Sequence, residues 1–169
     1  MTQPAAVDEK GMLVAYLDAQ RRHVLGILDG LSNEDMHRAV LPSGWTPAGL
    51  VNHLALDDER FWFRAVVAGE PPVIERIGKD GDAWQVAPDV LVADILDLYR
   101  QEIERSNAVI AATLLDAPPA WWPDFFPNFR LDNLRDVLLH VIAETACHAG
   151  HADAARELIA GRRWMVLTE

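Results

Sequence analysis

The chain has 169 residues, of which 50% are hydrophobic and 24% charged, as expected of a globular protein with one sizeable core. Its 15 Lys and Arg against 26 Asp and Glu give a net charge of −11, so nucleic acid is not an expected partner. We find no membrane-spanning apolar stretch and no signal peptide, and therefore expect a single cytoplasmic domain over residues 1–169 without a membrane partner.

Hydrophobic spacing predicts two helices in the first half of the chain. After a frayed tail over residues 1–8, a helix is expected from about Lys10 to Leu28, and a short helical turn over 33–38 follows. Thr46-Pro47 is a strong helix start, because Thr caps free N–H groups and Pro lacks one. We expect this second helix to continue to about Ala68.

Two further helices are predicted in the second half. A connection over residues 73–87 leads to a helix from about Pro88 to Leu114, on which Glu102 is expected to face solvent. The last helix should run from about Asp132-Asn133 to Gly161. Four long helices without a strand predict an all-α four-helix bundle, and the 15-residue second connection is long enough to cross it.

Residues 117–130 form a loop with five aromatic residues and four prolines. Trp121, Trp122, Phe125 and Phe126 give it more apolar surface than a loop should leave in water. One interpretation is a plug folded back over the bundle. The other is a lid on a site, or part of a dimer interface.

The last predicted helix carries His140, Glu144, His148 and His151. On a regular α-helix these four side chains fall within an arc of about 80°, so they share one face. Apolar residues lie in or beside that arc, which predicts that the row points into the core. Burying such groups is costly unless they are paired or bound to a metal. Cys147, the one cysteine, lies off this stripe, and we expect a small buried thiol.

Glu144 and His148 are spaced so that both can reach one metal ion, and His53 from the second helix can complete the set. Two imidazoles and one carboxylate match catalytic Zn²⁺, and the set also suits Fe²⁺, Ni²⁺ or Mn²⁺. A buried hydrogen-bond network and simple solvent exposure remain as alternatives.

The neighbouring polar residues have several possible roles. His140 is expected to support the ligands or to pack, while His151 can replace a ligand, accept a proton or bond to the neighbouring helix. Asp57, one turn after His53, either orients that imidazole or pairs with a nearby arginine.

The sequence resembles the DinB-like (YfiT-like) superfamily of metal-binding four-helix bundles, in the branch of mycothiol-dependent maleylpyruvate isomerase and mycothiol S-transferases. The similarity is carried by GLS at 30–32, PSGWTPAGLVNHLA at 42–55, RSNAVI at 105–110 and HVIAETACHAGHADAARELIAG at 140–161. The resemblance implies His53, Glu144 and His148 as metal ligands. It also implies an up-down-down-up bundle with a long crossover between its second and third helices, and often a homodimer.

We therefore expect a metal-dependent, zinc-containing S-transferase or isomerase that joins a low-molecular-weight thiol such as mycothiol to a small electrophile. In this reading His151 is catalytic and the aromatic loop covers the site. The rival hypotheses are a non-catalytic metal-binding bundle in stress response and a metal-dependent hydrolase, which would place water on the ion.

Overall fold

The computed structural model describes residues 8–161, and this part of the chain is helical, with no strand among those residues. The all-α prediction is confirmed. The tail expected at 1–8 lies outside the described residues except for Asp8. The elements are α1 (Glu9–Leu28), α2 (Asn33–Met36), α3 (Pro47–His53), the π-helix η1 (Leu54–Val67), α4 (Pro71–Ile74), α5 (Val92–Ala112) and α6 (Leu134–Ala160).

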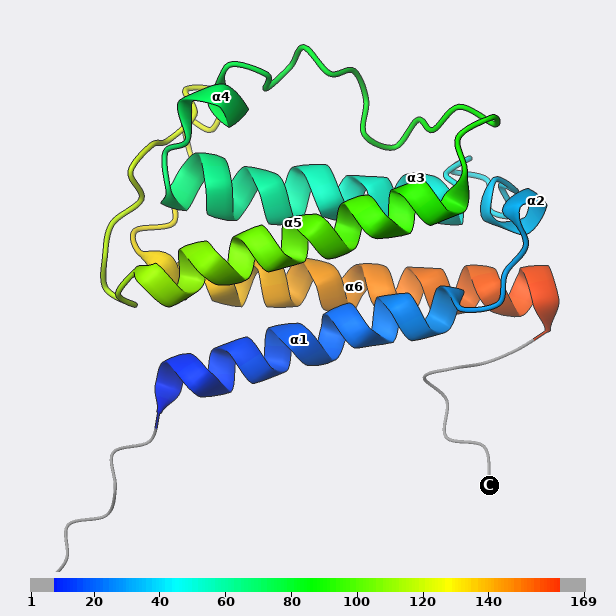
Figure 1. The fold of residues 1–169 in the computed structure, drawn as a ribbon, viewed down its shortest axis with the longest axis horizontal. Coiled ribbons are helices and arrows are strands. Elements are labelled where there is room, and N and C mark those ends of the chain that lie inside the picture. Colours follow the sequence, from blue (N-terminus) through cyan, green and yellow to red (C-terminus); the bar gives the residue numbers. More distant parts are fainter. Residues whose placement is uncertain (1–7, 162–169) are drawn as a thin grey trace, which may run out of the picture.

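The long helices lie side by side (Figure 1). α1 packs along α6, and η1 packs against both α5 and α6. η1 continues α3 without a break, and the connection over residues 75–91 then returns along the molecule, so that α5 runs in the same direction as η1 (Figure 1). None of the helices within residues 8–161 has the length and apolar character needed to cross a membrane.

Side-chain caps fix where the helices begin. Asp8 accepts a hydrogen bond from the Gly11 N–H, and Thr46 accepts one from Gly49 before Pro47 at the first helical position. Asn133 caps α6. At the other end of α6, Gly161 has φ of 65°, a left-handed conformation that suits glycine. These four ends follow directly from residues within one turn of them.

The second helix has the predicted extent but not the predicted backbone hydrogen bonding. Its second part, η1, is π-helical and closes with a bond from the Ala68 N–H to the Phe63 carbonyl, five residues back. Within η1, Asp57 has a side chain 52% exposed, whereas Asp58 and Glu59 are buried. These two follow the buried Leu54 and Ala55 by four residues, so the inward face keeps an α-helical spacing.

The expectation that Glu102 faces solvent is wrong. Its side chain is fully buried on α5, and arginines from η1 and from α5 itself donate to it. Buried charges of this kind require partners, and three guanidinium groups supply them here. The helix is also shorter than predicted, from Val92 to Ala112.

Two apolar clusters share the interior, with a polar layer between them. The first includes Val24, Leu50, Leu54, Tyr99 and Ala149, and the second includes Leu17, Phe63, Ile110, Leu138 and Val141. Along each long helix, the residues between the two clusters are polar and buried: Arg21, Asp58, Glu59, Glu102, Ser106 and Thr145. The bundle therefore carries a buried polar layer at mid-height.

Candidate functional site

His53 ends α3 and is held on two sides. Its ring stacks on Trp84, with centroids 4.2 Å apart and planes 20° apart. Its Nδ1 lies 2.9 Å from an Asp57 carboxylate oxygen. A carboxylate on one ring nitrogen fixes the tautomer and leaves Nε2 with its lone pair. Asp57 thus orients this imidazole.

His148 meets His53 from the opposite helix, α6. The two ring centroids are 5.0 Å apart, and the His148 Nε2 lies 3.8 Å from a Glu144 carboxylate oxygen. Burial, together with the nearby His53, lowers the pKa of His148 to about 4. The ring is therefore neutral at pH 7 and can act as an electron-pair donor. Its Nδ1 is buried and has no hydrogen-bond partner.

The structure brings His53, Glu144 and His148 together, but not in closed coordination geometry. Within residues 8–161, no group of three or more His, Cys, Asp or Glu side chains is already placed to hold a metal ion. The donor chemistry nevertheless fits a divalent cation, because two oriented imidazoles lie beside a carboxylate. The Glu144 side chain is 44% exposed and so has room to rotate toward the two rings.

The predicted row on α6 does not point into the core along its whole length, so that expectation is wrong in part. His151 is exposed, with its ring 5.6 Å from that of His148. His140 packs edge-on against Trp62 at 4.6 Å, and burial lowers its pKa. Cys147 is exposed rather than buried. Ala152, Ala155 and Arg156 beyond His151 are buried, so α6 is still covered there and the exposed residues lie on its outer side.

A cavity of about 500 Å³ opens beside His53, His140 and Glu144. Its polar wall consists of His53, Asp57, Asp58, His140 and Glu144. The rest of its lining is almost entirely apolar. A small organic molecule can therefore bind with most of its surface against hydrophobic groups and one polar end against the histidines.

The aromatic loop forms one wall of this cavity. Phe125, Phe126 and Phe129 line it together with Phe61 and Trp62 of η1. Phe126 stacks on Trp62, with planes 7° apart.

Trp121 and Trp122, the other two residues predicted for the loop's role, do not line the cavity. They pack against the second apolar cluster, where the Trp121 N–H donates to the Val66 carbonyl. The first part of the loop therefore packs on the bundle, and its second part lines the cavity.

Asp58 is a cavity residue that sequence reasoning missed. It is 4% exposed, and its Oδ2 has no hydrogen-bond partner. Burial raises its pKa well above the usual range, and the carboxylate of Glu144 adds to the effect. The run Asp57-Asp58-Glu59 is typical of a solvated charged surface, but Asp58 follows the buried Leu54 by four residues, and this spacing is the signal that places it inside.

These features define an all-helical protein whose histidines and one carboxylate border an aromatic-walled cavity for a small molecule. A model of the family described as mycothiol-S-transferase matches residues 12–161. The chain therefore belongs to the mycothiol S-transferase family, which confirms the resemblance seen in its sequence. No curated protein and no solved structure matched the chain.

Proposed function

We propose that the protein is a metal-dependent thiol S-transferase or isomerase that joins mycothiol, or a similar low-molecular-weight thiol, to a small electrophile. The observation that carries the proposal is the meeting of His53 and His148, with ring centroids 5.0 Å apart, beside Glu144, where His53 and Glu144 also line an apolar cavity. Zn²⁺ is the proposed ion, with Ni²⁺ or Fe²⁺ as alternatives. Membership of the family supports thiol transfer.

The chain's own residues have distinct roles in this proposal. His53, oriented by Asp57, and His148, neutral at pH 7, would hold the ion with Glu144. Bound there, a divalent cation supplies the positive charge that lowers the pKa of a thiol. The exposed His151 accepts the thiol proton, and the phenylalanines of the loop exclude water from the cavity.

The remaining parts of the proposal concern the whole protein. We propose one cytoplasmic domain over residues 1–169 with the up-down-down-up helix order of the DinB-like superfamily, assembled as a homodimer that binds no nucleic acid. The acidic net charge and the family support this description.

Metal content and turnover test the function together. Zinc-loaded protein should conjugate mycothiol to a generic electrophile such as iodoacetamide. His53→Ala should lower both bound zinc, measured by mass spectrometry, and turnover by at least about 100-fold. His23→Ala, on α1 and outside the cavity lining, is the matched control and should preserve both.

Equal conjugation rates with and without metal would contradict the proposal. A metal that raises the melting temperature without any thiol-dependent activity would favour the non-catalytic binding protein. Thiol-independent hydrolysis of an ester would favour the hydrolase.

A further inference from the structure

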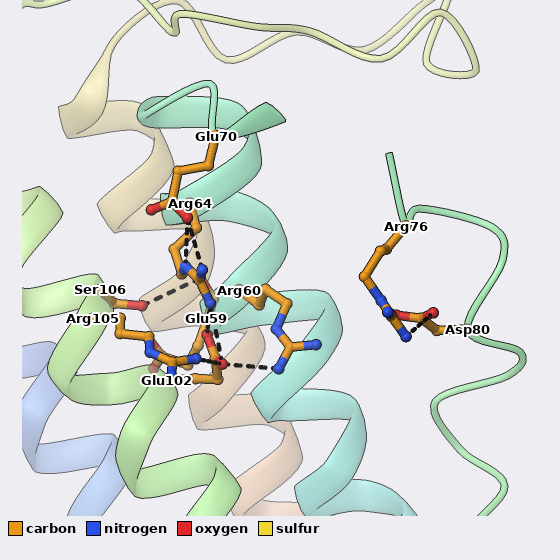
Figure 2. Close-up of polar contacts among 9 residues, drawn as sticks. All are labelled: Glu59, Arg60, Arg64, Glu70, Arg76, Asp80, Glu102, Arg105 and Ser106. Atoms are coloured by element: carbon orange, nitrogen blue, oxygen red, sulfur yellow. Dashed lines mark hydrogen bonds and ion pairs between the residues drawn. The ribbon is translucent and has the colours of Figure 1, made fainter. Parts of the chain in front are cut away.

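A second cavity of about 500 Å³ lies between η1, the segment over residues 72–83 and α5. Four arginines line it: Arg60, Arg64, Arg76 and Arg105. The chain has only 15 Lys and Arg against 26 Asp and Glu, so this concentration runs against its overall charge. Figure 2 shows the arginines of η1 and α5 gathered around Glu102, and the Arg76–Asp80 pair on the other side of the gap.

The ion pairs around Glu102 leave an excess of positive charge. Glu102 is fully buried and accepts from Arg60, Arg64 and Arg105 at 2.9, 2.9 and 2.7 Å. Glu70 pairs with Arg64 at 2.7 Å. Around Glu102, two carboxylates thus face three guanidinium groups, while the Arg76–Asp80 pair is neutral by itself and Asp57 adds a negative charge elsewhere in the lining. A carboxylate ligand would therefore contact the η1 and α5 arginines rather than the Asp57 side.

Arg60 holds the unused donors. One Nη2 bond reaches Glu102, whereas its Nε is buried and has no hydrogen-bond partner. Figure 2 shows this guanidinium extending from η1 toward the Arg76–Asp80 pair. Arg64, in contrast, uses all three of its nitrogens on Glu70 and Glu102. Arg105, with a side chain 51% exposed, can add a donor from α5.

From this arrangement we infer that the arginine cavity binds the carboxylate of a small organic acid. Arginine presents paired N–H groups that match a carboxylate, and such charge-assisted bonds are stronger than neutral ones. The ligand's carboxylate accepts from the Nη donors that Arg60 does not use on Glu102. Nothing in the proposed thiol chemistry uses these residues.

The two cavities share a wall. Asp57, Phe61 and Ile77 line both the arginine cavity and the cavity beside His53 and Glu144. An acid whose carboxylate contacts Arg60 therefore lies next to the candidate reaction site. Where the proposed function holds, on which this step rests, the preferred electrophile is acidic, with its carboxylate among the arginines and its reactive carbon toward His53.

Direct binding tests the cavity without reference to catalysis. Benzoate should bind the metal-free protein, followed by NMR titration at constant ionic strength, and the neutral isostere benzamide should bind at least tenfold more weakly. Arg60→Gln should weaken benzoate binding about tenfold, the loss of a charge-assisted pair. The control is Arg100→Gln, which removes an exposed arginine whose partner is Asp97 and should leave benzoate binding unchanged.

Equal binding of benzoate and benzamide, or equal binding to wild type and Arg60→Gln, would overturn the inference. If Arg60→Gln fails to fold by circular dichroism, Arg105→Gln replaces it, since that side chain is half exposed and leaves Glu102 two other partners. A weaker benzoate signal in this variant supports the cavity, and an unchanged one refutes it.

Turnover with a matched pair of electrophiles tests the substrate class. The thiol sulfur displaces iodide from iodoacetate or iodoacetamide, forming a C–S bond and releasing the thiol proton. Arg60→Gln should lower kcat/KM about tenfold for iodoacetate and leave iodoacetamide unchanged. Equal losses for both would refute the acidic preference. No transfer to either would refute the proposed function, while benzoate binding would still stand.

Discussion

Asp58 combines burial with an unpaired carboxylate oxygen, and this combination makes stability depend on pH. Its pKa is raised by burial first and then by Glu144. Because the folded-state pKa lies above the unfolded value, the folded protein retains a proton that the unfolded chain has lost. Stability is therefore lost as pH rises from the unfolded value toward the folded one.

Asp58→Asn should remove this dependence. In metal-free protein we expect the free energy of unfolding at pH 8 to rise by about 1–3 kcal/mol, the usual cost of an unpaired buried group. The gain should be smaller at pH 5, where more of the wild-type carboxyl is protonated. Urea unfolding of the wild type and the variant at pH 8 and at pH 5 measures this gain. Asp89→Asn, at an exposed position, is the control, and an equal gain at both pH values would disprove the explanation.

At the scale of elements, α1 and η1 are joined by a buried ion pair. Arg21 and Glu59 are 2% and 1% exposed, and the guanidinium donates to both carboxylate oxygens at 2.7 Å. Arg21 also donates to Asn107 of α5 at 2.8 Å. One side chain thus connects three of the long helices in the polar layer.

Removing one member of this pair should lower the free energy of unfolding more than removing both. Arg21→Met leaves Glu59 charged and buried, so we expect a loss of about 3–5 kcal/mol in the free energy of unfolding. The double variant Arg21→Met/Glu59→Leu should recover most of that loss. Urea denaturation of the two single variants and the double variant measures the coupling. Arg22→Met, at the exposed neighbouring position, should leave the free energy of unfolding nearly unchanged. Additive losses would show that the pair does not act as a unit.

At the scale of the whole molecule, the polar layer connects the two apolar clusters. Every long helix passes through both clusters, so neither can lose its packing without disturbing the other. Residues 8–161 should therefore unfold in one cooperative step.

Truncating a side chain in either cluster tests this cooperativity. Leu17→Ala in the second cluster and Leu50→Ala in the first should each lower the free energy of unfolding by about 2–5 kcal/mol, because both side chains are fully buried. Tryptophan fluorescence and far-UV circular dichroism should shift together in each variant. Separate transitions for the two signals would show that the clusters unfold independently.

The sequence by itself determined the features that depend on neighbouring residues. Thr46-Pro47 and Gly161 mark helix ends because capping acts within one turn. The spacing of Glu144 and His148 placed them on one face, and the motif around His53 indicated the family.

Only the tertiary structure decided which charged residues are buried, and with which partners. Glu59 finds Arg21 across 38 residues of chain, and Glu102 finds Arg60 across 42. No local pattern encodes such pairs, because their members are brought together only by the packing of separate helices. The arginine cavity appears only when η1, α5 and the connection between them come together, because its four arginines come from all three of these segments.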